Sequence, residues 1–223
     1  MKTQIIAEDN DILVCYKPAG FPVETVHSTK ADMVSELKKY LKEKTGQAYL
    51  GVIHRLDQPV SGYMVFAKTG EAAKNLSRQV TAGGEMHKEY EAVCFGSLSV
   101  KEGRLEDYLI TDKINNITRV ADSKTPTAKK AELEYKVIAC DEATVTLRIK
   151  LISGRHHQIR VQFANMGCPI LGDRKYGTEQ SKEYSLKNGI GNLKLSACCL
   201  TFRHPVTGKM MKFDSADMKD ERL

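Results

Sequence analysis

The chain has 223 residues, enough to bury one large hydrophobic core or two small ones. Its 41% hydrophobic and 28% charged residues are ordinary for a soluble globular protein. The 34 Lys and Arg residues outnumber the 28 Asp and Glu residues, and the resulting net charge of +6 is compatible with a polyanionic partner without requiring one.

Several classes of protein are excluded by simple patterns. No run approaches the roughly 18 to 20 apolar residues of a membrane span. The N-terminus reaches acidic residues too soon for a secretory signal. The six cysteines form no CxxC pair and lie mostly in apolar runs, which indicates buried thiols in a reducing compartment rather than a zinc site or a disulfide framework. We therefore expect a soluble, cytoplasmic protein with no membrane attachment.

The first predicted elements are a strand and a helix. The apolar run at residues 12–16 predicts a short strand, closed by a rigid turn that contains Pro18 and Gly20. Residues 31–44 have apolar side chains spaced along one face of a helix. We interpret this helix as scaffold with a solvated lysine face.

The stretch from residue 50 to 68 carries a candidate catalytic group. Two strand-like runs flank a loop that contains Asp57, Pro59 and Gly62. Pro59 fixes its own φ and favours an extended residue before it, so we expect a stiff loop that holds Asp57 at a strand end. On spacing alone, a surface turn with a local Arg55–Asp57 ion pair is the favoured interpretation.

The middle of the chain alternates between regular and irregular patterns. Residues 71–81 repeat the helical pattern and stop at a Gly-Gly pair. Residues 87–95 alternate as a strand that contains Tyr90, for which packing is the default role. The polar residues 101–127 lack clear periodicity, so we expect short strands and loops that cover the active face.

The second half of the chain is rich in predicted strands. Residues 131–139 and 143–151 alternate, and they predict an antiparallel pair across a turn at residues 141–142. Residues 193–202 and 210–213 predict a closing hairpin. Periodicity alone therefore supports a mixture of α and β structure.

Residues 151–167 form the second informative stretch. Ser153 is a candidate N-cap for a helix that Gly167 ends. His156 and Arg160 lie one turn apart on a face of this helix, where Arg160 alone is typical of an exposed arginine. Two adjacent histidines can indicate a metal, but adjacent helical side chains diverge and no third ligand stands at a useful spacing. We predict no metal site.

Motifs in these stretches resemble the RluA-type pseudouridine synthases. The chain has HRLDQPVSGYMVFAK where that family has HRLDxxTSGxxxxAK, and SGRHHQIRVQ where the family has TGRxHQIRxQ. The family's KPAG, KxYxA and LxAxxLxFxHP elements also occur, in the same order. Val60 and Ser153 stand where the family has Thr, and the effect of Val60 is left open.

The resemblance covers about residues 10–213. It implies a single catalytic domain over residues 1–223 with no separate N-terminal RNA-binding domain. The implied fold class is α+β, with a large mixed, mostly antiparallel sheet, flanking helices and a central active-site cleft. In that cleft, Asp57 and Arg160 are expected to meet from opposite halves.

The implied reaction converts uridine in RNA to pseudouridine. The glycosidic bond to nitrogen breaks, the base turns, and a bond to carbon-5 forms. Nothing is oxidised and no group is donated, so we expect no cofactor, and the sequence has neither a dinucleotide-binding motif nor a Walker loop. Asp57 is expected to attack the sugar or the base, or to remove the 2′ proton on the way to a glycal, and these alternatives stay open.

The resemblance also assigns roles to other side chains. Arg160 is expected to hold Asp57 ionised and oriented. Tyr90 is expected to stack on the base and to assist loss of the carbon-5 proton. Arg55 is suited to fill the gap left by a flipped-out uridine, and unpaired uridines are the easier targets. The remaining candidate substrate-binding residues are His54, Arg155, His157 and Gln158.

Two other functions compete with this one. A catalytically silent RNA-binding module does not need Asp57, Tyr90 and Arg160 together, so the presence of all three argues against it. A glycoside hydrolase needs a second carboxylate at a defined distance, and none stands out in the motifs. Ribosomal RNA and transfer RNA both stay open as the substrate, and the lack of a dedicated RNA-binding domain favours a monomer.

Overall fold

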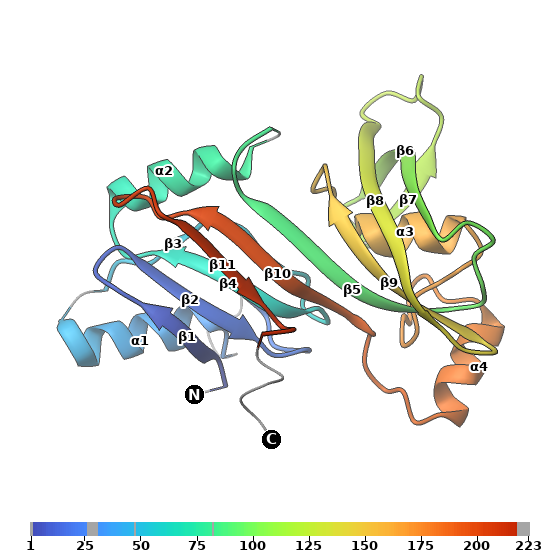
Figure 1. Cartoon of the computed structure of the whole chain (residues 1–223), viewed down its shortest axis with the longest axis horizontal. Helices are drawn as coiled ribbons and strands as arrows, with labels where there is room; N and C mark the ends of the chain where they lie inside the picture. Colours follow the sequence, from blue (N-terminus) through green and yellow to red (C-terminus); the bar gives the residue numbers. More distant parts are fainter. Residues whose placement is uncertain (1, 26–30, 47, 82, 218–223) are drawn as a thin grey trace. The chain divides into compact units, whose positions relative to one another are not determined.

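The computed structural model divides the chain into two compact units (Figure 1). The first contains residues 1–88 and 197–223, and the second contains residues 89–196. The structure describes residues 2–25, 31–46, 48–81 and 83–217. A single domain over the whole chain stays a prediction.

The first unit combines antiparallel strands with two helices. The strands are β1 (Gln4–Glu8), β2 (Ile12–Lys17), β3 (Gly51–Val52), β4 (Ser61–Ala67), β11 (Met210–Asp214) and most of β10 (Leu195–Arg203). β2 pairs with β1 and β4, β3 pairs with β4, and β10 pairs with β11, all antiparallel. The helices are α1 (Met33–Thr45) and α2 (Gly70–Val80).

Local side chains set the ends of these helices. Asp32 caps α1, because its Oδ1 accepts a hydrogen bond from the backbone N of Ser35 at 2.7 Å. Gly46 ends α1 in the left-handed conformation at φ 73°. Thr69 caps α2 in the same way as Asp32 caps α1, through the backbone N of Ala72 at 3.1 Å.

The core of the first unit is formed by alternate residues of its strands. β2 and β4 place Val14 opposite Val65, and both are fully buried. α2 covers this cluster with Leu76. One side chain in two from each strand therefore faces this layer, and the burial patterns show that the other face of both strands is covered as well.

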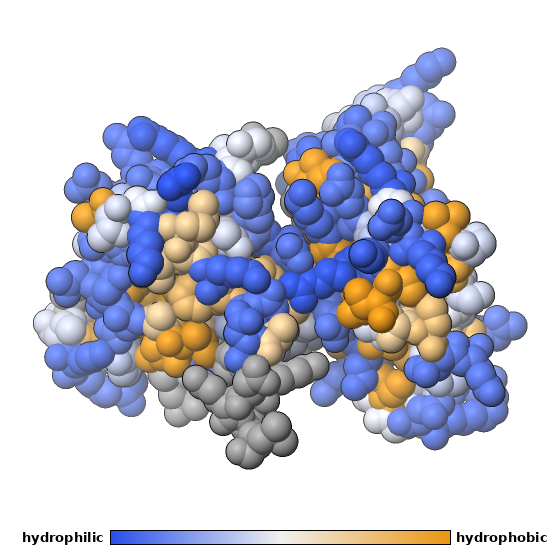
Figure 2. Space-filling model, in the orientation of Figure 1, coloured by the Kyte–Doolittle hydropathy of each residue, from blue (hydrophilic) through white to orange (hydrophobic). Residues whose placement is uncertain are grey.

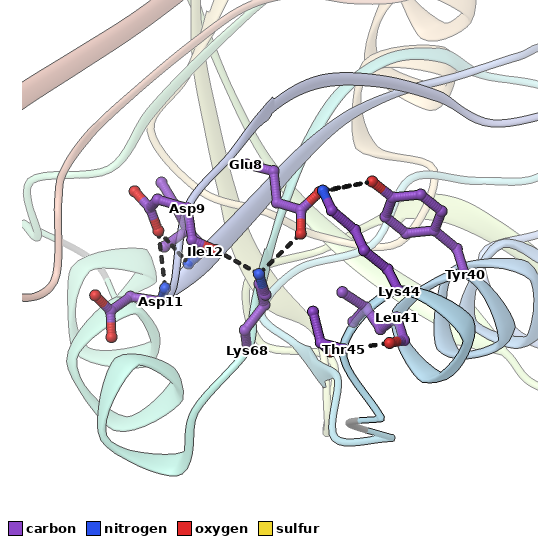
Figure 3. Close-up of polar contacts among 9 residues, drawn as sticks. All are labelled: Glu8, Asp9, Asp11, Ile12, Tyr40, Leu41, Lys44, Thr45 and Lys68. Atoms are coloured by element: carbon purple, nitrogen blue, oxygen red, sulfur yellow. Dashed lines mark hydrogen bonds and ion pairs between the residues drawn. The ribbon is translucent and has the colours of Figure 1, made fainter.

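A polar network ties the β1–β2 turn to α1 and to the end of β4 (Figure 3). The Nζ atom of buried Lys68 donates to Glu8 Oε1 at 2.9 Å and to the carbonyl of Asp9. The Oε2 atom of Glu8 accepts from Tyr40 and from Lys44, each at 2.8 Å. Burial alone would raise the pKa of Glu8, but these hydrogen bonds outweigh it and lower the pKa to about 2. Lys68, the last residue of the first long motif, is therefore linked through Glu8 to α1.

The second unit is a twisted antiparallel sheet with two helices. Its strands run in the order β5 (His87–Phe95), β9 (Thr144–Leu151), β8 (Lys129–Cys140), β6 (Glu102–Asp112) and β7 (Ile117–Ala121). The helices are α3 (Gln158–Asn165) and α4 (Glu179–Lys187). Val161 of α3 packs on Leu109 and Ala131, so α3 lies against β6 and β8.

Most of the predicted elements are confirmed. The fold class is α+β with a mostly antiparallel sheet, and the strand predicted at residues 12–16 (β2), the first two helices, the β8–β9 pair and the closing hairpin lie where the sequence pattern placed them; β1 was not predicted. Each of the six cysteines, all of which the structure describes, is a thiol rather than half of a disulfide, and Cys140 is the exposed one among them. In the part of the chain that is described, no helix is long and apolar enough to cross a membrane. Most of the viewed face is hydrophilic (Figure 2).

Two local expectations are wrong. Residues 101–127 contain an 11-residue strand, β6, paired with β7. Its pattern is hidden because its solvent face pairs charges with β8, as in the 2.9 Å contact between Arg104 and Glu132. The strand before Asp57 is reduced to two residues, and Gly62 lies inside β4, where a Cβ atom would stand 2.4 Å from the carbonyl O of Ala197.

Candidate functional site

Asp57 lies in the irregular segment between β3 and β4, and a buried lysine clamps that segment. The Nζ atom of Lys17 donates to the carbonyl oxygens of Pro18 at 3.1 Å, Gln58 at 2.9 Å and Val60 at 2.6 Å. The backbone N of Val60 donates to the carbonyl of Asp57 at 3.0 Å. The loop is therefore fixed directly after Asp57, whose side chain is half-buried.

Lys17 also brings a positive charge close to this loop. Burial lowers the pKa of Lys17 to about 8, and the charge of Asp57 acts in the opposite direction. Lys17 is thus cationic at neutral pH although it is fully buried. Sequence reasoning recognised the KPAG turn but missed this role; the available signal was a lysine at the end of an otherwise apolar strand.

The two residues before Leu56 differ in exposure. His54 is buried, and its Nε2 accepts from the backbone N of Val65 at 3.3 Å. Its Nδ1 has no hydrogen-bond partner among the described residues, and burial followed by the charge of Lys88 lowers the pKa of His54 to about 3. His54 is therefore a neutral group that supports the loop from inside. Arg55 is exposed, as a residue that reaches RNA needs to be.

In the second unit, Arg160 of α3 forms a buried ion pair with Asp173. Its Nε and Nη2 atoms donate to the two carboxylate oxygens at 2.7 and 2.8 Å, and both side chains are almost fully buried. Burial would raise the pKa of Asp173, but the hydrogen bond and charge of Arg160 lower it. The interpretation of Arg160 as an exposed helical arginine is therefore wrong, because the bidentate pair compensates its burial.

Asp173 was missed as a functional candidate. Its Oδ1 also accepts from the backbone N of Lys175 at 2.9 Å and of Tyr176 at 3.1 Å, so it fixes the turn after it. The guanidinium of Arg160 lies 5.0 Å from the centre of the Tyr176 ring. Asp173 and Tyr176 together hold Arg160 from two sides. Asp57 belongs to the other unit, and its pairing with Arg160 stays a prediction.

Helix α3 begins differently from the prediction. Its N-cap is His157, in the left-handed conformation at φ 53° and without a side-chain cap. The Oγ atom of Ser153 instead accepts from the backbone N of Glu132 at 2.8 Å and donates to Oε1 of Gln158 at 2.9 Å. Gln158 is buried, and its Oε1 also accepts from the backbone N of Arg155 at 3.0 Å. Gln158 therefore ties the loop before α3 to β8.

The adjacent histidines do not diverge, contrary to the prediction, because both precede the first turn of α3. Their rings stack with centres 3.7 Å apart. His157 is buried, and its Nδ1 lies 2.7 Å from the hydroxyl of Tyr176, which accepts from the backbone N of Thr118 at 2.9 Å. Burial, followed by the charge of Arg160, lowers the pKa of His157 to about 3. Because the ring is neutral, its Nδ1 can accept a hydrogen bond from the hydroxyl of Tyr176.

The predicted Tyr90 lies in β5, opposite Ile149 of β9. It is 7% exposed. Arg155 is exposed, and its Nε donates to the carbonyl of Lys130 at 2.8 Å. The catalytic role of Tyr90 and the substrate-binding roles of His54, Arg55, Arg155, His157 and Gln158 stay predictions.

One group of side chains in the first unit has the composition of a metal site: Asp9, Asp11 and His204. The Nε2 atom of His204 lies 2.8 Å from Asp9 Oδ2, while its Nδ1 accepts from the backbone N of Val206 and Thr207. The ring proton therefore lies on Nε2 and points to Asp9. This arrangement satisfies His204 through the protein alone, and it fits a structural role better than a metal ligand.

Comparisons with known proteins agree with the motifs. Residues 11–165 match the sequence profile of the RNA pseudouridylate synthase family. Ribosomal large subunit pseudouridine synthase D of Yersinia pestis is 31% identical over 224 residues, which is 97% of this chain and 67% of the relative. An uncharacterized RNA pseudouridine synthase of Aquifex aeolicus is 34% identical over 219 residues, 94% of this chain and 68% of the relative.

A solved structure shows the same fold. Human RNA pseudouridylate synthase domain containing 4 matches with a TM-score of 0.76 and 21% sequence identity, over 95% of this chain and 87% of the human one. The chain spans about two thirds of the length of the curated relatives that it matches.

Proposed function

The chain belongs to the RNA pseudouridylate synthase family, and we propose that it isomerises specific uridines of structured RNA to pseudouridine, with Asp57 as the nucleophile. The observation that carries the proposal is that the family match includes Asp57, on a loop that Lys17 clamps. The reaction is an isomerisation: the bond between N1 and carbon-1′ breaks, and the bond between carbon-5 and carbon-1′ forms. The carbon-5 proton is lost and N1 gains a proton, so the atoms balance without a donor.

To act as a nucleophile, the carboxylate of Asp57 must be ionised and held in place. The nearby cation of Lys17 favours the ionised form, and the three carbonyl contacts of Lys17 keep the loop in place. A glycal route needs the same carboxylate as a base, and both routes stay part of this proposal. The uridine is expected to flip out of the RNA, with Arg55 filling the gap.

Arg160 and Tyr90 complete the proposed catalytic set. Arg160 is to pair with Asp57, while Asp173 and Tyr176 fix the position of its guanidinium within the second unit. Tyr90 is to stack on the base and to assist loss of the carbon-5 proton. His54, Arg155, His157 and Gln158 are then best understood as residues that shape the binding surface. Three of them, His54, His157 and Gln158, are buried and act through the loops that they hold.

We propose ribosomal RNA as the substrate and transfer RNA as the second candidate. Relatives from Yersinia pestis and Vibrio vulnificus are named ribosomal large subunit pseudouridine synthases D and C. The net charge of +6 supports binding to a polyanion. We further propose that the protein is a cytoplasmic monomer. Its targets are expected in small structured regions of RNA, because an unpaired uridine costs less to flip out than a paired one.

The substrate is tested by mapping pseudouridine in total RNA from cells with and without the gene. Loss of one or a few sites in large-subunit ribosomal RNA is expected, and reintroduction of the gene should restore them. Loss confined to transfer RNA would replace the first substrate by the second. If no site is lost and the purified protein leaves unmodified transcripts of both RNAs unchanged, the proposed activity is wrong.

A further inference from the structure

Two buried cysteines of the second unit lie in contact and take no part in the proposed reaction. Cys94 belongs to β5, and Cys168 follows the turn that ends α3; their side chains are 0% and 1% exposed. Ile170 forms an antiparallel bridge with Cys94, and the backbone N of Leu171 donates to the carbonyl of Val93 at 2.9 Å. The segment that begins at Cys168 therefore runs antiparallel to β5.

The backbone directs the two thiols towards each other. Residues directly opposite in an antiparallel pairing point to the same face, and so do residues two apart in an extended chain. Cys168 stands two residues before Ile170, and Pro169 between them favours an extended conformation of Cys168. The backbone N of Cys168 donates to the carbonyl of Phe163 at 2.9 Å, which ties it to α3. In this arrangement the thiols of Cys94 and Cys168 share a hydrogen bond.

The shared hydrogen bond makes the two thiols chemically unequal. The thiol of Cys94 donates to the sulfur of Cys168, which lowers the pKa of Cys168 and, together with burial, raises the pKa of Cys94. Because the thiolate is the nucleophilic form of cysteine, Cys168 is suited to attack an oxidant and Cys94 to react second. Cys15, a buried thiol of the first unit, differs: burial, followed by the charge of Glu8, raises its pKa to about 12.

The attacking thiol also lies next to an exposed turn. Asn165, Met166 and Gly167, which directly precede Cys168, are all exposed, and Gly167 reverses the chain at φ 78°. A local opening of this turn is enough to bring a small oxidant to the sulfur, without unfolding of the sheet.

We propose that Cys94 and Cys168 are an oxidisable pair in which a peroxide forms a disulfide. The thiolate of Cys168 attacks one peroxide oxygen, the O–O bond breaks, and the second oxygen leaves as hydroxide, which takes up the thiol proton to give water. The sulfur of Cys94 then attacks the resulting sulfenic acid, the S–O bond breaks, and the hydroxyl leaves with the proton of Cys94 as a second water. Two thiols and one peroxide thus give one disulfide and two waters, with two electrons passing from sulfur to oxygen.

The disulfide joins β5 to the segment between α3 and Asp173, entirely within the second unit. It closes a loop of residues 94–168, which contains strands β6 to β9 and α3. Closing a long loop restricts the unfolded chain, so the oxidised protein is the more heat-stable form. In a reducing compartment, thiol donors reverse the bond. None of these steps requires the proposed RNA activity.

Peptide mapping of the full chain detects the disulfide. The reduced protein is treated with hydrogen peroxide, its remaining thiols are blocked with N-ethylmaleimide under denaturing conditions, and it is digested with trypsin without reduction. Peptides 89–101 and 161–174 then carry one cysteine each, Cys94 and Cys168. We expect these two peptides to be cross-linked, and to separate after dithiothreitol, while Cys15 is recovered in its blocked form. Recovery of both peptides singly and blocked would overturn the proposal.

Three variants test the order of the reaction. Cys94→Ser keeps a hydrogen-bond donor but has no second thiol, so Cys168 should stay a sulfenic acid that dimedone traps. Cys168→Ser should leave Cys94 unlabelled. The matched control Cys140→Ser removes the exposed thiol and should form the cross-link at the wild-type rate. Absence of dimedone labelling from Cys94→Ser, labelling of Cys94 in Cys168→Ser, or loss of the cross-link in Cys140→Ser would each contradict the proposed pair.

Melting temperature tests whether the folded protein accommodates the bond. The oxidised wild type should melt at least about 5 °C above the reduced protein and return to the lower value after dithiothreitol, whereas Cys168→Ser should show no such shift. In urea, the same peroxide treatment should give mixed disulfides rather than the single cross-link. A lower melting temperature after oxidation, or the same single cross-link in urea, would show that the fold does not place these thiols for a disulfide.

Discussion

Replacing Asp173 by Asn tests how Arg160 is held. The substitution removes the negative charge from a buried pair with contacts of 2.7 and 2.8 Å, so Arg160 loses the carboxylate that holds it within the second unit. Asn keeps one oxygen that can accept from the backbone N of Lys175 and Tyr176, so the turn itself survives. Removing one partner of a buried pair costs about 3–5 kcal/mol. Because the turn is retained, we expect about 3 kcal/mol, a large share of the stability of a typical domain.

The free energy of unfolding is measured by urea denaturation at neutral pH for the wild type and three variants. Glu183→Gln is the control, since it breaks an exposed pair with Lys187 at 2.9 Å and should cost less than about 1 kcal/mol. Arg160→Met/Asp173→Asn removes the pair altogether and should be more stable than the sum of its single variants by at least about 1.5 kcal/mol. A cost for Asp173→Asn below about 1 kcal/mol, or strict additivity in the double variant, would refute this account of Arg160.

Further predictions concern three other groups. Lys17→Met removes a group whose pKa is about 8 in the folded state and 10.5 when unperturbed. Because the unfolded chain holds this proton over that range, the free energy of unfolding of the wild type, compared with that of the variant, should rise by up to about 3 kcal/mol as the pH rises from 8 to 10.5. If the difference measured by urea denaturation does not change with pH, Lys17 is not a buried, titrating lysine. The pKa of Glu8 is lowered to about 2, so its stabilising contribution is complete above about pH 4.5 and is lost as the pH falls towards 2. Lys68→Met should therefore shift the midpoint of acid unfolding, followed by circular dichroism, to higher pH. An unchanged midpoint would refute the network in Figure 3. Tyr90→Phe should keep RNA affinity and lose turnover in a single-turnover assay, whereas a loss of affinity alone would limit Tyr90 to stacking.

Apolar periodicity was sufficient for the strands and helices that bury one face. β8 and α1 place apolar residues at the period of their structure, and β2 is a short continuous apolar run. Helix α4 was not predicted, because its buried residues are Ser181 and Ser185 rather than an apolar stripe. The strand pattern of β6 was also obscured, because ion pairs with β8 place charged residues on its solvent face.

The motifs brought attention to single residues but not to their partners. Arg160 was identified from the QIR element, whereas Asp173 lies 13 residues later and its burial depends on how the chain folds back. Lys17 was likewise missed, since a sequence cannot show that three carbonyls surround its amino group. The cap of α3 was misassigned because Ser153 bonds to Glu132, a residue from a distant strand. Each of these errors concerns a contact between segments far apart in the sequence.

The proposed role of Asp57 as the catalytic carboxylate is tested by the turnover of an Asp57→Asn variant. Purified wild type, Asp57→Asn and the exposed control Glu142→Gln are incubated with an unmodified transcript of the mapped RNA, and pseudouridine is quantified under single-turnover conditions. We expect no detectable product from Asp57→Asn, wild-type product from Glu142→Gln, and unchanged melting temperatures for both. Product formation by a folded Asp57→Asn variant at a rate near that of the wild type would contradict it.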